Sequence, residues 1–215
     1  MEFDLRLKTN FKLFLTGPSG CGKTVFISEL LLNLESISQS PPKRVVYYYK
    51  TWQDKFEEMK NQKLVDEFIG DNANLLEQVK EMSESTFIIF DDLLNSTNLP
   101  SIAELYTVYG RHMGLSLAFI SQKMFVNNEF FRQISQNSDY FVVFKNPRNF
   151  SEIRTLASQL TPSSLELIDI FKKATISPYS YLLINLTQEC EPQLKYLGNL
   201  FKVDGVINSY VVNNY

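Results

Sequence analysis

A glycine-rich run near the amino terminus has the composition of a phosphate-binding loop. Glycines let backbone amides turn toward phosphate oxygens, and the amino end of a following helix adds a favourable field for an anion. The run reads Gly17, Pro18, Ser19, Gly20, Cys21, Gly22, Lys23 and Thr24. Lys23 would reach the β- and γ-phosphates of a nucleotide, and the Thr24 hydroxyl would ligate Mg²⁺. The run therefore predicts a Walker A motif.

A second motif is an apolar run that ends in two carboxylates. Residues 87–90 are Phe, Ile, Ile and Phe, and Asp91 and Asp92 follow them. Because Mg²⁺ prefers oxygen ligands and keeps several waters, Asp91 would hold the ion through its water shell. Asp92 stands where many ATPases carry a glutamate that polarises the attacking water, but its side chain is one methylene shorter. The run predicts a Walker B strand and leaves the identity of the general base open.

Gln122 is a candidate for contact with the γ-phosphate. It follows an apolar run at residues 115–121. If that run is a parallel strand beside the Walker B strand, its carboxyl end lies at the edge where such sheets bind ligands. Gln122 would then bind the γ-phosphate or orient the attacking water; the alternative is a solvent-facing side chain that only ends the strand.

Arg111, which precedes that run, is a candidate for an arginine supplied to a neighbouring subunit. An arginine provided in trans stabilises the charge of the phosphoryl-transfer transition state, and this arrangement requires a ring-shaped oligomer. Arg132 and Arg148 are alternatives for the same role. A surface ion pair is the competing explanation for each of them.

Short apolar runs alternate with helix-like patterns, which indicates an α/β fold with a mostly parallel sheet flanked by helices. Strands are expected at residues 11–16, 44–49, 86–91, 115–121, 139–144 and 180–186. Helices are expected at residues 23–36, 52–61, 72–82, 100–110, 127–136, 149–159 and 163–173. After Pro192 the pattern weakens, so residues 1–190 are expected to form the core. Residues 191–215 are expected to form an extension that packs on the core or on a neighbouring subunit.

The overall composition narrows the possible functions. A chain of 215 residues suits one α/β core, and a net charge of −3 argues against coating nucleic acid through overall positive charge. Any contact with DNA would be local, with Lys123, Lys145 and Arg148 as candidates. The apolar runs are far shorter than the roughly 18 residues of a membrane span. With two cysteines and one histidine, neither a disulfide framework nor a metal cluster is expected, and a reducing intracellular compartment is favoured.

Together these motifs resemble the FtsK–HerA superfamily and, within it, the genome-packaging ATPases of double-jelly-roll viruses, the kind found in polintons, virophages and poxvirus relatives. The resemblance covers roughly residues 10–190 and rests on residues 15–24, residues 88–92, the Gly-Arg-His sequence at 110–112 and Gln122. It implies a RecA-like P-loop NTPase of the ASCE class that hydrolyses ATP with Mg²⁺. It also implies a homo-oligomeric ring, expected to hold five or six subunits, that drives double-stranded DNA into a preformed capsid.

That resemblance implies capsid proteins at a portal or packaging vertex as partners, and a location in the virus factory or nucleus of a host cell, or in the virion. Two other functions stay open. One is a replicative helicase of superfamily 3, although those enzymes typically end the sensor strand in asparagine rather than in a residue such as Gln122. The other is an assembly factor in which ATP binding switches a capsid-docking surface. A small nucleoside kinase is disfavoured because the sequence has no arginine-rich lid.

Overall fold

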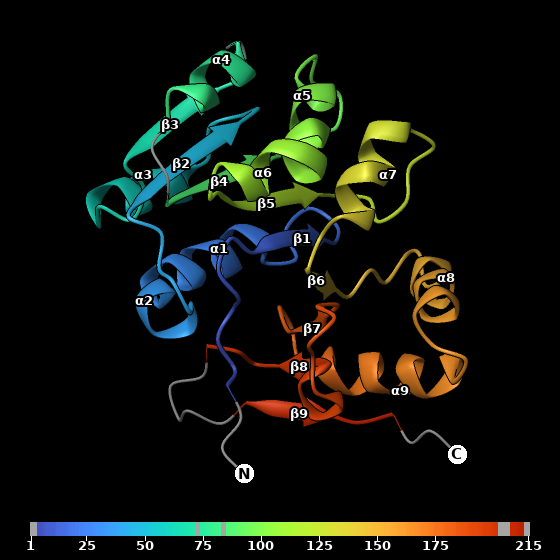
Figure 1. The fold of residues 1–215 in the computed structure, drawn as a ribbon. Helices are drawn as coiled ribbons and strands as arrows, with labels where there is room; N and C mark the ends of the chain where they lie inside the picture. Colours follow the sequence, from blue (N-terminus) through green and yellow to red (C-terminus); the bar gives the residue numbers. More distant parts are fainter. Residues whose placement is uncertain (1–3, 72–73, 83–84, 202–206, 213–215) are drawn as a thin grey trace.

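The computed structural model describes residues 4–71, 74–82, 85–201 and 207–212. These residues form one central sheet with helices on both of its faces (Figure 1). The strands are β1 (Lys12–Thr16), β2 (Arg44–Tyr49), β3 (Glu67–Gly70), β4 (Thr86–Asp91), β5 (Ser116–Ser121), β6 (Tyr140–Phe144), β7 (Tyr181–Asn185), β8 (Tyr196–Gly198) and β9 (Asn208–Tyr210). The helices are α1 (Lys23–Leu32), α2 (Leu34–Ile37), α3 (Asp54–Asn61), α4 (Leu75–Lys80), α5 (Leu99–Glu104), α6 (Gly110–His112), α7 (Glu129–Gln136), α8 (Ser151–Leu160) and α9 (Ser164–Ala174). Two further turns are the π-helical η1 (Leu105–Tyr109) and the 3₁₀ turn η2 (Pro192–Leu194).

The strand order determines which loops meet at each edge of the sheet. In the described part of the chain the order is β3-β2-β4-β5-β1-β6-β7-β8-β9. The strands from β3 to β6 in this order run parallel, and β7, β8 and β9 continue the sheet in antiparallel fashion. Every residue of β4 and β5 is buried, as expected for strands covered on both faces. The predicted mostly parallel sheet flanked by helices is confirmed.

The sequence pattern does not predict β3, β8 or β9. No residue of β3 is fully buried, and β8 and β9 have only three residues each. Such short strands carry too little apolar alternation to be distinguished from turns, and their pairing with a neighbouring strand holds them in place. Because β8 pairs with β7, part of the predicted extension belongs to the same sheet as the core. The division of the chain at residue 190 stays a prediction.

The long helix predicted at residues 23–36 is interrupted at Asn33. Its side-chain amide donates to the carbonyl oxygen of Glu29 at 2.8 Å, and its own backbone leaves the helical region. This local bond competes with the helical pattern and ends α1, and α2 begins at the next residue. The other predicted helices are present with shifted ends, and residues 72–73, where one of them was predicted to start, lie outside the described residues. Among the helices that the structure describes, none is long and apolar enough to cross a bilayer.

The helix predicted at residues 100–110 contains the π-helical turn η1. Thr107 in this turn donates its hydroxyl to the carbonyl oxygen of Ala103 at 3.0 Å. Gly110 directly follows the turn, and a Cβ atom there would lie 2.6 Å from the carbonyl oxygen of Leu105. Only glycine allows the backbone to pass so closely, so the turn depends on this residue. The hydroxyl of Tyr106, also in the turn, donates to the carbonyl oxygen of Leu13 at 2.9 Å and attaches η1 to β1.

Strand β1 lies between two hydrophobic cores. Leu13 and Leu15 pack into the core under α1, whereas Phe14 points into the core on the opposite face of the sheet. The ring of Phe14 lies 5.0 Å from that of Phe141 and 5.5 Å from that of Phe131, measured between centroids. These contacts fix the position and direction of β1 within the sheet, and therefore the position of the glycine-rich loop that follows it.

Replacing Phe14 by alanine should lower the free energy of unfolding by about 3–5 kcal/mol, because it removes a fully buried ring and leaves a cavity. The measurement is urea denaturation of both proteins. Leu165→Ala is the control, since Leu165 is 77% exposed and should shift stability by less than about 0.5 kcal/mol. Equal stability of the Phe14 variant and the wild type would show that this aromatic cluster does not hold β1.

Candidate functional site

The glycine-rich loop connects β1 to α1 at the carboxyl edge of the parallel strands. A Cβ atom on Gly17 would lie 2.7 Å from both the sulfur of Cys21 and the Cβ of Phe144. Gly22 has a φ of +107°, a region that other residues rarely adopt. The loop can close over the end of β1 only with glycine at these positions, which explains the spacing in the sequence.

Lys23 folds back over the loop. Its ammonium group donates to the carbonyl oxygens of Gly17 and Pro18 at 2.6 and 2.8 Å. Both acceptors are neutral, whereas phosphate oxygens carry negative charge and attract the ammonium group more strongly. The lysine is therefore positioned to exchange these two carbonyls for an anion that enters the loop.

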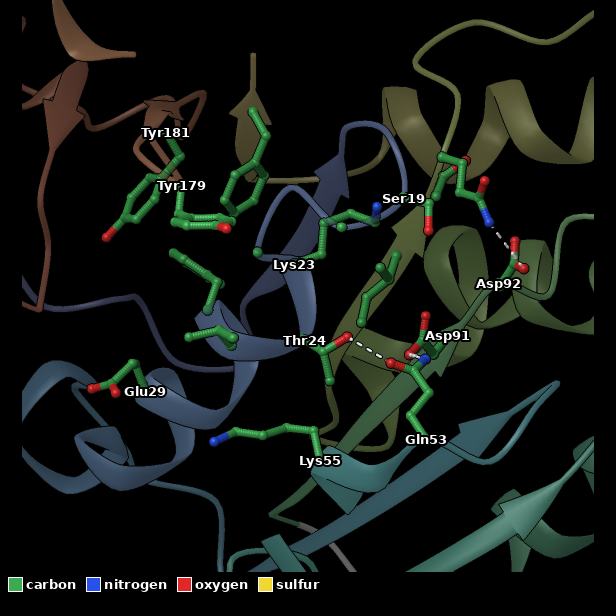
Figure 2. A pocket seen from close by; sticks show the side chains of 18 of the residues that line it. Ser19, Lys23, Thr24, Glu29, Gln53, Lys55, Asp91, Asp92, Tyr179 and Tyr181 are labelled. Atoms are coloured by element: carbon green, nitrogen blue, oxygen red, sulfur yellow. Dashed lines mark hydrogen bonds between the residues drawn. The ribbon is translucent and has the colours of Figure 1, made fainter. Parts of the chain in front are cut away.

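Asp91, at the end of β4, lies at the centre of a hydrogen-bonded network that reaches Thr24. Its Oδ2 accepts from the hydroxyl of Tyr47 at 2.9 Å and from the amide of Gln53 at 3.3 Å. The hydroxyl of Thr24 donates to the other end of the Gln53 amide at 3.2 Å. Figure 2 shows Gln53 between Thr24 and Asp91, the two residues that the sequence predicts as magnesium ligands.

Burial makes the negative charge of Asp91 costly. The carboxyl group is 6% exposed, and burial raises its pKa from 3.8 to about 6. The hydrogen bond from Tyr47 opposes this increase, the nearby charge of Asp92 adds to it, and Lys23 opposes it. A cation beside the carboxylate would remove much of this cost. An oxygen-only pair with an undercompensated charge fits Mg²⁺, so Thr24 and Asp91 could hold this ion.

Asp92 and Gln122 meet next to this network. Strand β5 lies parallel to β4, as predicted, and the amide of Gln122 donates to Oδ2 of Asp92 at 3.3 Å. Asp92 has a φ of +57°, while its backbone N–H still bonds to the carbonyl oxygen of Ile120 at 3.2 Å. With this left-handed backbone the Asp92 side chain points away from Asp91 (Figure 2) and accepts its hydrogen bond from Gln122. The two carboxylates can therefore act on different parts of a ligand.

Apart from the fully buried Tyr47, these side chains line one cavity of about 630 Å³. Its polar end is lined by the loop together with Gln53, Asp91, Asp92 and Gln122. Its other end is lined by residues from the last third of the chain, which the sequence does not connect to the site: Phe144, Tyr179, Tyr181, Asn199 and Phe201. Trp52, which follows β2, packs on Tyr49, Phe56 and Phe68.

Sequence reasoning also misses Tyr47 and Gln53 as partners of Asp91. Tyr47 lies within β2 and Gln53 follows that strand, so both approach Asp91 only because β2 pairs with β4. Strand adjacency of this kind is a property of the fold. The one available signal is the position of Gln53 just after an apolar run, at the edge where ligand-binding residues gather.

Arg111 lies at the opposite edge of the sheet from the loop. It lines a second, polar cavity of about 770 Å³ together with Lys12, where β1 begins, and Asp139, which precedes β6. One chain therefore does not bring Arg111 to its own glycine-rich loop. Lys123 follows β5, and Lys145 and Arg148 follow β6, so these cations share the edge that carries the loop.

Comparison with known proteins gives one family and a set of similar folds. The Poxvirus A32 protein family matches residues 2–196 of the chain. No curated protein matches the sequence.

Solved structures with this fold include viral and bacterial ATPases. The genome packaging NTPase B204 of Sulfolobus turreted icosahedral virus 2, in complex with ATP-gammaS, has a TM-score of 0.58 and 15% identity, over 84% of this chain and 95% of that chain. The DNA-packaging ATPase B204 of Sulfolobus Turreted Icosahedral Virus has a TM-score of 0.55 and 13% identity, over 95% and 99% of the two chains. The cytoplasmic domain of the Thermomonospora curvata type VII secretion ATPase EccC has a TM-score of 0.56 and 15% identity, over 88% of this chain and 26% of that one. At these identities the likeness shows the fold alone, which is that of RecA-like P-loop ATPases.

Replacing Asp91 by asparagine should stabilise the nucleotide-free protein at neutral pH. Between pH 3.8 and about 6 the folded state holds the Asp91 proton more tightly than the unfolded state, so stability falls as the pH rises through this window. The asparagine variant should be more stable by up to about 3 kcal/mol at pH 7, and the difference should vanish below pH 4. Urea denaturation across this pH range measures it. A variant less stable than the wild type at pH 7 would show that Tyr47 and Gln53 compensate the charge fully.

Proposed function

We propose, from the premise that this chain belongs to the Poxvirus A32 protein family, that it is the ATPase of a motor that moves double-stranded viral DNA into a preformed capsid. The observation that carries this proposal is the single cavity onto which the glycine-rich loop, the two carboxylates and Gln122 converge. The likeness to structures described as a genome packaging NTPase and a DNA-packaging ATPase supports it. The fold alone does not determine the function, so the site and the family carry the argument together.

In this proposal the loop and Lys23 bind the β- and γ-phosphates of ATP. The backbone amides of Gly20 to Thr24 face the anion, and Lys23 transfers its hydrogen bonds from the loop carbonyls to phosphate oxygens. Thr24 and Asp91 would hold Mg²⁺, which would neutralise charge on the phosphates. Gln53, which joins Thr24 to Asp91, gives up its position between them.

Asp92 is proposed as the general base. It accepts a proton from water as the water oxygen forms a bond to the γ-phosphorus, and the bond from that phosphorus to the bridging oxygen breaks with its electron pair leaving on ADP. Gln122 donates to Asp92 and lies at the end of β5, where its amide can also reach the γ-phosphate. This shared contact links the state of the phosphate to the orientation of the base.

Arg111 would act on the nucleotide of the next subunit in a ring. Its place at the amino edge of the strands separates it from the loop of its own chain, so a stacked or ring-like arrangement of subunits is needed to bring it to a phosphate. We propose a homo-oligomeric ring of five or six subunits that docks on capsid proteins at a portal or packaging vertex. Lys123, Lys145 and Arg148 would contact duplex DNA, in the virus factory or nucleus of the host cell or in the virion.

Duplex DNA should raise ATP turnover, and the increase should coincide with oligomer formation in a protein concentration series followed by mass measurement. Lys23→Ala should abolish ATP binding, whereas Asp92→Asn should keep binding and lower kcat by about 10²- to 10⁴-fold. Lys172→Ala should match the wild type, because Lys172 pairs with Asp169 on the surface. If duplex DNA left ATP turnover unchanged at every protein concentration, the proposal of a DNA-translocating motor would be contradicted. An Asp92→Asn variant that retained full function in capsid assembly would favour the nucleotide-switched assembly factor.

Mixed oligomers test whether Arg111 acts in trans. Arg111→Ala subunits keep an intact loop, and Lys23→Ala subunits keep Arg111, so each variant alone should be inactive. Mixing them should restore part of the turnover, because a Lys23→Ala subunit can complete the site of an Arg111→Ala neighbour. Recovery is measured as ATPase activity against mixing ratio at constant total protein. The absence of any recovery, with mixed oligomers verified by mass, would remove Arg111 from the site.

A further inference from the structure

The cavity has two chemically different ends. Around the loop it is polar, and it holds Lys23 together with the carboxylates and Gln122. The opposite end is lined mostly by apolar and aromatic side chains: Val25, Phe26, Phe144, Tyr179, Tyr181 and Phe201. A triphosphate occupies only the polar end, so the aromatic end is available for an uncharged, flat group.

Charge fixes which way a nucleotide enters. Glu29 lies on α1 six residues beyond Lys23, a rise of about 9 Å along the helix. Burial raises the pKa of the Tyr181 hydroxyl, and the negative charge of Glu29 raises it further, so this carboxylate faces the aromatic end. Lys55, another cation that lines the cavity, is paired with Glu58. A phosphate chain is therefore repelled from the aromatic end and attracted to Lys23.

Tyr179 differs from the other aromatic residues of this end. It is 73% exposed, and in the described part of the chain its ring is paired with no other aromatic ring. Tyr181, in contrast, is buried, packs edge-on against Phe26 at 4.8 Å and accepts a hydrogen bond from the backbone of Leu200 at 2.9 Å. Tyr181 thus supports the wall of the cavity, whereas the ring of Tyr179 is free to contact a ligand.

A backbone turn that follows α9 holds Tyr179 beside the glycine-rich loop. The φ of Tyr179 is +62°, the positive value that the third residue of such a turn adopts, and the backbone N–H of Ser180 donates to the carbonyl oxygen of Ser177 to close it. The side chain lies next to the start of α1, since a Cβ atom added to Gly22 would be 3.5 Å from the Cβ of Tyr179. Figure 2 places Tyr179 and Glu29 at the same end of the cavity, away from Asp91 and Asp92.

We propose that Tyr179 stacks on the nucleobase of ATP and sets how tightly the nucleotide binds. The inference rests on the proposed function in that it assumes a nucleoside triphosphate in this cavity. A stacked ring contacts the face of a base and not its edge. The larger purine rings are therefore bound more strongly by stacking than the pyrimidine rings. Purine nucleotides should consequently bind more tightly than CTP or UTP, through Tyr179.

Substitution of Tyr179 by asparagine isolates this role. Asparagine tolerates a positive φ, so Tyr179→Asn removes the ring while keeping the backbone and should not lower the melting temperature. The Kd for ATP, measured by calorimetry without DNA, should rise by about 5- to 150-fold, the range for loss of one base stack. The Kd for inorganic tripolyphosphate, which has no base, should stay unchanged. Tyr179→Phe should bind ATP like the wild type because it keeps the stacking face.

Ile176→Asn is the matched control, because Ile176 lies in the same loop, is 79% exposed and does not line the cavity. It should leave both affinities unchanged. At saturating ATP, Tyr179→Asn should keep kcat within about twofold while KM rises, as expected for a lost ground-state contact. Equal weakening of ATP and tripolyphosphate would show that Tyr179 acts on the loop through Gly22, and unchanged ATP affinity would show that no stack forms; either result overturns the inference. Because binding is measured without DNA, failure of DNA stimulation would overturn the motor and leave this result intact.

Discussion

The in-register hydrogen bonding of β1 to β5 and of β5 to β4 determines where every group of the site lies. Thr16 pairs with Ser121, and Ile120 pairs with Asp91, so the three strands end at nearly the same level. The glycine-rich loop, the carboxylates and Gln122 each begin within a residue or two of these pairs. A slip of one residue would turn the core-facing side chains to the other face of the sheet. The two cores around β1 oppose such a slip and so protect the geometry of the site.

The buried carboxylate of Asp91 determines which ligands the site at the ends of these strands can bind. Asp91 sits where burial favours its neutral form, and its two hydrogen-bond donors compensate the charge only in part. Because the charge of Asp91 is buried and only partly compensated, a cation beside it is favoured, and that cation would in turn offset the charge of a phosphate chain. The loop behaves similarly, because Lys23 rests on neutral carbonyls that are weaker partners than phosphate oxygens. The hydrogen bonds of Lys23 and Gln53 are therefore contacts that a nucleotide and its cation can replace.

The sequence predicts the central part of the fold well, because buried parallel strands have continuous apolar runs. The bounds of β2 and β4 match the expected ranges, and the adjacency of β5 to β4 agrees with the order expected from the Walker B strand and Gln122. What the sequence cannot supply depends on pairing between distant segments. Tyr47 and Gln53 reach Asp91 through the contact of β2 with β4. The aromatic end of the cavity combines residues of α1, β6, β7 and the segments around β7 and β8, which are far apart in the sequence. Short strands such as β3 have no periodic signal of their own and form against an existing edge.

The π-helical turn η1 has a consequence for how the position of Arg111 could arise in evolution. A π turn holds one more residue than an α turn, and each helical residue rotates the chain by about 100°. The extra residue therefore rotates α6, with Arg111 and His112, relative to α5. Gly110 is the position at which the close backbone approach of this turn is possible. A single-codon insertion could thus redirect an arginine around the helix axis without altering the strands on either side.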